Sequence, residues 1–308
     1  MSMDISAEKL KNELQGGGFL SEIKDVRMPN SREMQDMALD EMYKRHDNPD
    51  SEEIRDQFGK FLEYLIDTEQ DLYQQYEDKV YRKSMVYFVE DFYKSGQSAI
   101  DGYGKDTNTE FTEYPEIQNL LQEIELVYKS SDSFEEAFSE IFPMLYPLVS
   151  EISTSASQSR KKRAGDSLRG HVESLIKEAG FSIDSSRQVS NGLVYTISEA
   201  DNLESEGGEL YLASHMTLKD RFRQSLSELL EAEGTKQMGK YIATASGKNL
   251  ITSSDDDDIT KNKIREIKNE GFKLIVFEDV KDKFLAEPSV ITYEDFIKNY
   301  VEPLATRV

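Results

Sequence analysis

The sequence has 308 residues and a mass of 35.3 kDa, a length typical of two domains of about 150 residues each. It contains no Cys and only three His, which excludes disulfides, thiolate metal sites and cysteine nucleophiles. No run approaches the roughly 18 apolar residues of a membrane span, and the N-terminal residues lack the apolar core of a signal peptide. We therefore expect a soluble, cytoplasmic protein without membrane contact.

Charge divides the sequence into two unequal halves, and the net charge of the whole is −23. Residues 1–150 hold 33 acidic and 15 basic residues, a net of −18, whereas residues 151–308 hold 27 and 22, a net of −5. The difference predicts a domain boundary near residue 150. The acidity argues against a nucleic-acid partner, because phosphate binding relies on Lys and Arg, but it leaves open a local basic groove or adaptation to high salt.

The first half, residues 1–150, is predicted to be all-helical. Apolar residues at helical spacing favour helices over residues 56–76, 80–93, 115–128 and 133–149. Pro143 and Pro147 are expected to bend the last of these helices. The half contains no catalytic pattern, so we expect it to serve partner contact or dimerisation.

The second half begins after a small, polar stretch at 150–159, which we interpret as a linker. A helix is predicted over 163–179, with Gly180 as its C-terminal stop. Strands are predicted at 193–197, 210–213, 240–244 and 273–277, and further helices at 220–233, 255–270 and 291–300. This order indicates an α/β domain with a mixed central sheet flanked by helices.

Two basic clusters stand out in this half. SRKKRAG at 159–165 places four consecutive cations at the predicted helix start, where the helix dipole disfavours them, and KDRFRQ at 219–224 follows a strand. A DNA backbone would favour such cations, although a solvated charge run is the alternative interpretation. The predicted DNA contacts are Arg160, Lys161, Lys162, Arg163, Lys219, Arg221 and Arg223.

The two clusters together resemble a known family. SRKKRAGDSL followed by LASHMTLKDRFRQSL is similar to the catalytic domain of the EcoRII type II restriction endonucleases, which shows an SRKxRAGxSLE helix, a GxxxPD strand and an ACKTTCKDRWRQ segment. The similarity covers about residues 156–300, in the same order. It implies a PD-(D/E)xK endonuclease-like fold over residues 151–308 and a double-stranded DNA partner. In such a site carboxylates hold Mg²⁺ and a Lys orients the attacking water.

Carried over onto this sequence, the resemblance leaves that metal site incomplete. The acid that ends SLE is Arg169 here, the Asp of the PD motif falls on or next to Ile197, and the active-site Lys corresponds to His215. Ile cannot ligate a hard cation, Arg repels one, and a neutral His offers less positive charge than Lys. We therefore expect no bound metal and no resident cofactor.

Other family positions are retained. The resemblance implies a vestigial catalytic site made of His215, Lys219, Arg221 and Glu228. It also implies contacts with the recognition bases from Arg160 and Lys161. The leading prediction is thus a DNA-binding member of the family whose cleavage is weak or absent. Arg169 would pair with phosphate in place of the metal.

Two other functions stay open. An active Mg²⁺-dependent endonuclease would need relocated metal ligands, for which the candidates are Glu199, Asp201, Glu209 and Glu228. A helical interaction or regulatory protein would use the acidic half instead, which could also cover the basic groove as a DNA mimic. The resemblance also favours a homodimer, since a two-fold symmetric DNA site asks for a two-fold symmetric protein. Whether a DNA methyltransferase or an active nuclease is a further partner stays open.

Overall fold

The computed structural model describes residues 7–14, 28–77, 80, 115–189, 192–200, 208–218, 222–223, 226, 238–246 and 258–306. Contacts divide the chain into two compact units. Unit 1 takes in residues 1–30 and 72–161, and unit 2 takes in residues 31–71 and 162–308. Each unit therefore draws on two separate segments of the chain, an arrangement that differs from consecutive domains at 1–150 and 151–308.

The described part of unit 1 is helical. It includes α1 (Ala7–Leu14), α6 (Pro115–Ser130) and the first turns of α7 (Phe134–Glu178). The Glu13 carboxylate accepts hydrogen bonds of 3.0 Å from the backbone N–H groups of Glu116 and Ile117. It thereby satisfies two donors at the start of α6, where the helix dipole also favours negative charge. The helix predicted at 115–128 is confirmed.

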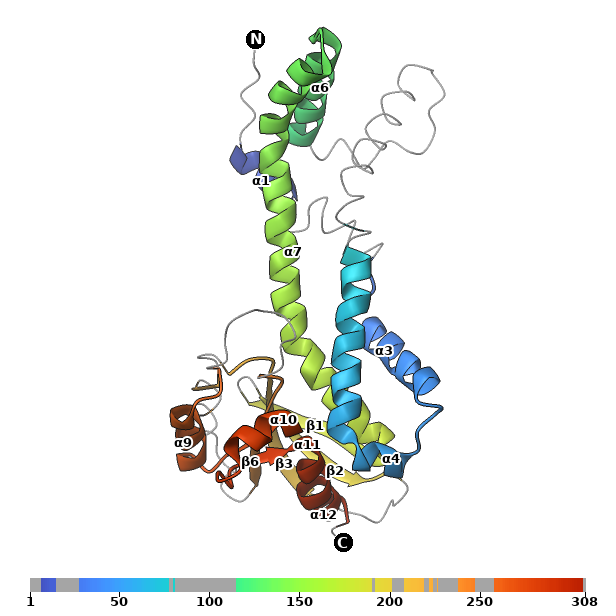
Figure 1. Cartoon of the computed structure of the whole chain (residues 1–308), viewed down its shortest axis with the longest axis vertical. Helices are drawn as coiled ribbons and strands as arrows, with labels where there is room; N and C mark the ends of the chain where they lie inside the picture. Colours follow the sequence, from blue (N-terminus) through green and yellow to red (C-terminus); the bar gives the residue numbers. More distant parts are fainter. Residues whose placement is uncertain are drawn as a thin grey trace. The chain divides into compact units, whose positions relative to one another are not determined.

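Helix α7 corrects two predictions. It is 45 residues long and continues through Pro143, Pro147 and the stretch 150–159, so that stretch is not a linker (Figure 1). The basic run 160–163 consequently lies inside a helix rather than at its start, and the dipole argument for it does not hold. The Ser and Ala residues of this stretch suggested a loop, but Ala is a strong helix former and Ser is tolerated within a helix. Gly180, with φ +85°, ends the helical segment as predicted.

Unit 2 begins with three helical stretches: α3 (Ser31–Arg45), α4 (Ser51–Asp56) and residues 58–77. The third stretch crosses the unit boundary, because the first segment of unit 2 ends at residue 71. Asp47 and Asn48 have φ of 56° and 58° and form a turn between α3 and α4. The helix predicted at 56–76 is confirmed, whereas α3 was not predicted because its apolar spacing is weak. The helix predicted at 80–93 lies outside the described residues, apart from helical residue 80.

A six-stranded mixed sheet forms the centre of unit 2, in the order β1-β2-β3-β4-β5-β6. The first three strands are antiparallel, and β3 to β6 are parallel. The strands are β1 (Phe181–Val189), β2 (Gly192–Glu199), β3 (Gly208–His215), β4 (Gly239–Thr244), β5 (Lys273–Val276) and β6 (Val290–Thr292). The predicted mixed α/β fold is confirmed, with β1 and β6 in addition to the four predicted strands.

The two faces of this sheet carry different layers. On one face, strand residues pack with α9 (Lys261–Asn269); we call it the α9 face. This core contains Val194, Tyr211, Ala213, Leu218, Phe222, Ile242, Ile264, Ile267, Leu274 and Val276. On the other, the α7 face, the Tyr195 hydroxyl reaches Glu173 of α7. Because successive strand residues point to opposite faces, each strand side chain can be assigned to one layer.

The C-terminal segment corrects two helix boundaries. Helix α9 begins at Lys261 after the N-cap Thr260, so Asp258 lies outside the helix predicted at 255–270. Residues 290–292 form β6, and only then do α11 (Tyr293–Phe296), the π-helical turn Ile297–Val301 and α12 (Glu302–Ala305) follow. A short α10 (Glu278–Lys281) and the 3₁₀ turn Asp282–Phe284 connect β5 to β6. The helix predicted at 220–233 falls mostly outside the described residues.

Candidate functional site

Arg169 lies near the end of α7, held by carboxylates of its own helix. Its Nη2 is 3.3 Å from Asp166 Oδ1, and its Nε is 4.0 Å from Glu173 Oε1. Glu173 Oε1 also accepts a 2.5 Å hydrogen bond from the Tyr195 hydroxyl, and burial together with this bond raises the pKa of Tyr195 above its usual range. The arginine is 42% exposed. A cation thus already stands between two acids that lie three and four residues away on the same helix face.

Ile197 lies in the interior of the α7 layer. It is fully buried, pairs with Gly208 across β2 and β3, and shares the face of Tyr195. Buried apolar neighbours surround this part of the sheet, so the position suits a branched aliphatic side chain. It offers no oxygen donor to a cation.

His215 ends β3 and lies elsewhere. It pairs with Thr244 of β4, is 8% exposed, and shares the α9 face with Ala213. Gly208, the partner of Ile197, is seven residues away along β3, or about 23 Å at the usual rise per residue. His215 and Ile197 therefore lie at opposite ends and on opposite faces of the same strand pair.

The placement of the PD aspartate on Ile197 is thus not supported by the geometry. In an antiparallel pair the start of one strand lies beside the end of its neighbour, and here Gly192 of β2 pairs with Ala213 of β3. A side chain meant to act with position 215 would have to come from the start of β2. Arg169, whose charge acts on Tyr195, lies on the side of the α7 face, as does Ile197.

A buried polar network that the sequence interpretation missed lies beside His215. Asp258 Oδ2 accepts hydrogen bonds from the backbone N–H of Leu218 at 2.7 Å and from the Ser246 hydroxyl at 2.5 Å. The Leu218 N–H also reaches Ser246 Oγ at 2.9 Å, and Thr244 donates to the same oxygen at 2.8 Å. These hydrogen bonds join three segments: the one after β3, the one after β4 and the one before α9.

Lys263 supplies the positive charge of that network. Its Nζ donates to the Asp258 carbonyl oxygen at 2.7 Å and lies 3.4 Å from Asp258 Oδ1. A buried carboxylate with this many donors is well compensated. The network fixes the backbone at Leu218, and the buried Phe222 fixes the chain again four residues later. Sequence reasoning placed Asp258 in a helix N-terminus; Thr260, a good N-cap residue, was the signal against it.

The predicted DNA contacts are only partly described. Arg160, Lys161, Lys162 and Arg163 belong to α7, but their side chains lie outside the described residues, as do Lys219, Arg221 and Glu228. Arg223 is described, and its guanidinium pairs with Glu266 of α9, with Nε 3.0 Å from Oε2 and Nη2 3.3 Å from Oε1. This pairing lowers the pKa of Glu266. A phosphate that binds Arg223 would have to displace that carboxylate.

A second buried polar cluster joins the helical residues 58–77 to α7. The Ser167 hydroxyl donates to Glu69 Oε2, and His171 Nε2 lies 2.7 Å from the same oxygen. All three side chains are less than 9% exposed. Both partners meet the carboxylate rather than each other, so the set lacks the serine–histidine bond that nucleophilic catalysis requires. We assign it to helix packing.

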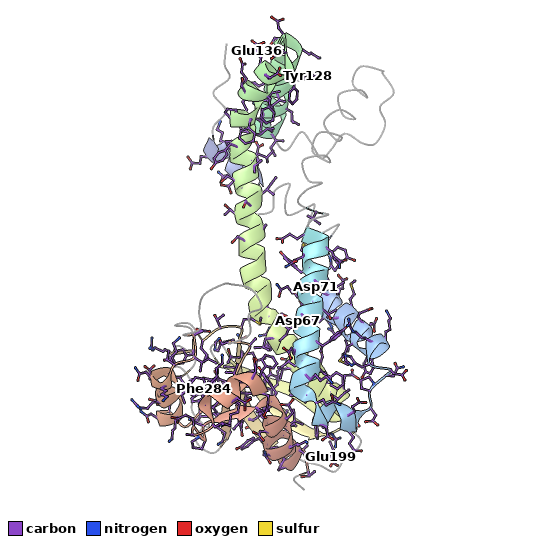
Figure 2. The ribbon with its side chains drawn as sticks, viewed as in Figure 1. Asp67, Asp71, Tyr128, Glu136, Glu199 and Phe284 are labelled. Atoms are coloured by element: carbon purple, nitrogen blue, oxygen red, sulfur yellow. The ribbon has the colours of Figure 1, made fainter. Side chains whose placement is uncertain are left out.

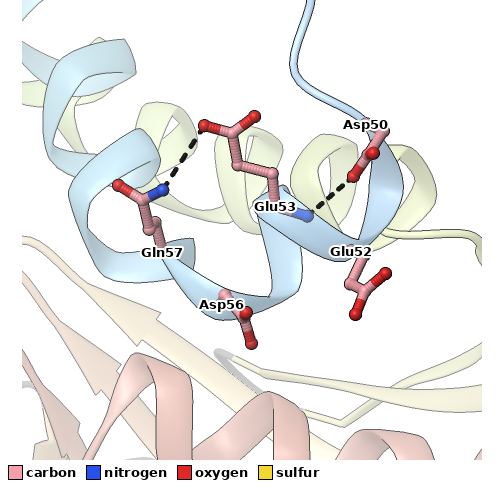
Figure 3. A pocket seen from close by; sticks show the side chains of 5 residues that line it. All are labelled: Asp50, Glu52, Glu53, Asp56 and Gln57. Atoms are coloured by element: carbon pink, nitrogen blue, oxygen red, sulfur yellow. Dashed lines mark hydrogen bonds between the residues drawn. The ribbon is translucent and has the colours of Figure 1, made fainter.

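An acidic hollow of about 340 Å³ lies at α4 (Figure 3). Asp50, Glu52, Glu53, Asp56 and Gln57 line it. Asp50 Oδ1 accepts from the Glu53 backbone N–H as the helix cap, and the Gln57 amide donates to Glu53 Oε1. Its carboxylates would repel a phosphate backbone, so the hollow is not part of a DNA surface.

The described residues do not fit the Mg²⁺ site of the family that the sequence resembles. Among them, no group of three or more His, Asp and Glu side chains could hold a metal ion. Of the relocated ligands considered, Glu199 lies on the α7 face and Glu209, which pairs with Thr196, on the α9 face. Asp201 and Glu228 lie outside the described residues.

Comparisons with known proteins give a family and a fold. A family model described as EcoRII C terminal matches residues 134–297, more than half of the chain. Two similar solved structures are metal-depleted Ecl18kI in complex with uncleaved, modified DNA and the same metal-depleted protein with uncleaved DNA. Each has a TM-score of 0.65, and the identities are 14% and 15%. Each match covers 97% of this chain and 85% of the other; at such identities the likeness shows the fold.

The comparison with curated proteins found no relative of this sequence. Within the described ranges, every helix is too short or too polar to cross a bilayer.

Proposed function

The chain belongs to the EcoRII C-terminal family, and from this premise we propose that it binds double-stranded DNA while its metal-dependent cleavage is weak or absent. The DNA partner is supported by the family and by solved structures of the same fold that hold DNA. The basic run 160–163 and the segment 219–223 supply cations for phosphates on an otherwise acidic chain.

Arg169 is the observation that carries the loss of cleavage. It occupies the position of a family acid, and its guanidinium reaches the two nearby carboxylates, Asp166 and Glu173. These acids are therefore neutralised by a side chain, and a divalent cation would meet a fixed positive charge at the same place. Ile197 and His215, at separate ends of the strand pair, add no oxygen donor.

The proposal extends to the expected partners. A homodimer would match a two-fold symmetric DNA site, and a DNA methyltransferase or an active nuclease would give a non-cleaving protein a place in restriction–modification. The competing candidate, an active endonuclease with relocated ligands, would depend on Asp201 and Glu228 among others. The same experiment separates the two functions.

The test uses gel-shift and cleavage assays of the full chain on mixed-sequence duplex DNA, with Mg²⁺, with Mn²⁺ and with a chelator. We expect a shift that chelation leaves unchanged, and no cleavage. Cleavage in Mg²⁺ establishes the active endonuclease instead, and a chain that neither shifts nor cleaves DNA leaves only the interaction protein.

A charge variant makes the binding assay specific. Lys162→Ala with Arg163→Ala should weaken binding and reduce the salt dependence of the affinity by about two phosphate contacts, because each contact releases counterions. Lys44→Ala with Lys129→Ala removes the same charge from helices that the proposal leaves uninvolved, and should change neither quantity. Equal effects of the two double variants contradict the assigned surface.

A further inference from the structure

The first turns of α7 expose a row of aromatic side chains. Phe134, Phe138, Phe142 and Tyr146 recur every four residues and are 75%, 54%, 55% and 64% exposed. The first three rings stack in sequence, with centroids 5.8 Å and 5.6 Å apart. Val149, 50% exposed, extends the same row. We call these five residues the aromatic stripe.

The same turns also have a buried side. Ala137 and Leu148 are 5% and 1% exposed, so α7 already places other residues inside unit 1. The stripe is therefore a second apolar face in addition to the one used for folding, and amphipathic helices in globular proteins normally have one. A contiguous apolar face of this kind marks a surface that associates.

Charge decides what the stripe binds. Residues 141–150 contain no charged side chain, within a half of the sequence whose net charge is −18. Glu135 and Glu136, beside the first ring, would repel nucleic acid, whereas residues 141–150 offer no carboxylate to a basic partner. Two copies of an acidic surface can approach where each is uncharged.

Area supports the same occupant. An aromatic side chain offers about 150–250 Å², so the stripe at its exposed fractions gives on the order of 500 Å² per copy. Two copies would bury about 1,000 Å², which is about the minimum for a biological interface between proteins. Leu126 and Tyr128 of α6 are 64% and 69% exposed and add apolar area in the same unit; Figure 2 shows Tyr128 on α6 and Glu136 on α7.

We propose that the aromatic stripe is the face through which two copies of this chain associate, with the rings of one copy packed between those of the other about a two-fold axis. This inference rests on the homodimer included in the proposed function but not on DNA binding, and its test uses no DNA. A stripe with a four-residue repeat can interdigitate with its own copy, since ridges of such residues fit the grooves between them.

The test is the mass of the full chain by analytical ultracentrifugation above about 10 μM, a range in which interfaces of this size associate. We expect the wild type to be a dimer and Phe138→Asp with Phe142→Asp to dimerise at least 100-fold more weakly, since central aromatic residues dominate such interfaces. Leu285→Asp, a charge on a 72% exposed leucine of unit 2, should leave the dimer intact. Circular dichroism and thermal unfolding check that each variant is folded.

A crosslinking measurement locates the contact independently. The chain has no Cys, so Phe138→Cys, Phe142→Cys and Tyr146→Cys each introduce one thiol. Identical residues meet only near a two-fold axis, so at least one of these variants should give a dimer with a short bis-maleimide, and Leu285→Cys should not. A monomeric wild type, a dimer that survives the double Asp variant, or crosslinking at Leu285→Cys alone would overturn the proposal.

Discussion

The layers on the two faces of the central sheet each contain a buried carboxylate, and these two carboxylates have different hydrogen-bond partners. On the α7 face, Glu69 meets the Ser167 hydroxyl and the His171 ring, and its Oε1 and His171 Nδ1 have no hydrogen-bond partner. On the α9 face, Asp258 receives a backbone N–H, a hydroxyl and the Lys263 ammonium.

The positions of these carboxylates explain the difference. Glu69 lies between two helices and fixes how they pack. Asp258 lies at the ends of β3 and β4, where α/β folds present their ligand groups, and it holds the backbone directly before the predicted DNA segment. The polar cluster on the α7 face therefore stabilises the scaffold, whereas the network on the α9 face holds the chain next to the segment that is predicted to bind DNA. Four variants test this contrast.

The largest effect is expected on the α7 face, from Ile197→Asp. The change places an unpaired carboxylate in a fully buried position, which should lower the free energy of unfolding by about 4 kcal/mol or more. Ile197→Val, the matched control, should cost about 1 kcal/mol. Urea unfolding measures both. A stable Ile197→Asp protein that gains a Mg²⁺-dependent rise in stability would restore the PD assignment at this position.

The second largest loss of stability is expected from Glu69→Ala. It leaves Ser167 and His171 buried without their shared acceptor and opens a cavity, at a cost of about 3 kcal/mol of unfolding free energy. Asp71→Ala, an exposed acid two residues along the same helix, should change stability by less than about 0.5 kcal/mol. Equal losses in the two variants, measured by chemical unfolding, would show that the cluster does not hold the helices.

Asp258→Asn should cost less stability but should also affect binding. The amide retains the shape and one acceptor oxygen but loses the charge opposite Lys263, which should cost about 2 kcal/mol. Because Leu218 is then held less firmly, the salt dependence of DNA affinity should also fall. Glu69→Ala, tested at a temperature where it is folded, should leave that salt dependence unchanged. A normal salt dependence in Asp258→Asn contradicts the positioning role.

The smallest effect, a change in DNA affinity, is expected from Glu266 on the exposed surface of α9. Glu266→Gln releases the Arg223 guanidinium from its carboxylate and should tighten DNA binding roughly two- to fivefold at low salt, less at high salt. Glu270→Gln removes an equal charge at the C-cap of the same helix and serves as the control. If both variants bind DNA equally well in a titration, Arg223 is not a contact.

Several elements were predictable because their signal is local. Strands β2, β3, β4 and β5 consist of short apolar runs, and Gly180 ends a helix with the positive φ that glycine tolerates. Strand β1, with Asp184 and Arg187 in it, lacks such a run and pairs only because β2 lies beside it. Helix α7 contains two prolines and a polar Ser-rich stretch, and no local rule indicates that it continues through both.

The site divides in the same way. Sequence motifs alone indicated the family and the basic clusters, and they led to the prediction that Arg169 replaces a family acid, because ungapped motifs fix residue identity. Only the tertiary structure decided that Ile197 and His215 lie apart, since strand register and alternation of faces depend on pairing between distant segments. It also brought Asp258, Ser246 and Leu218 together across up to 40 residues of sequence, a contact that no spacing rule contains.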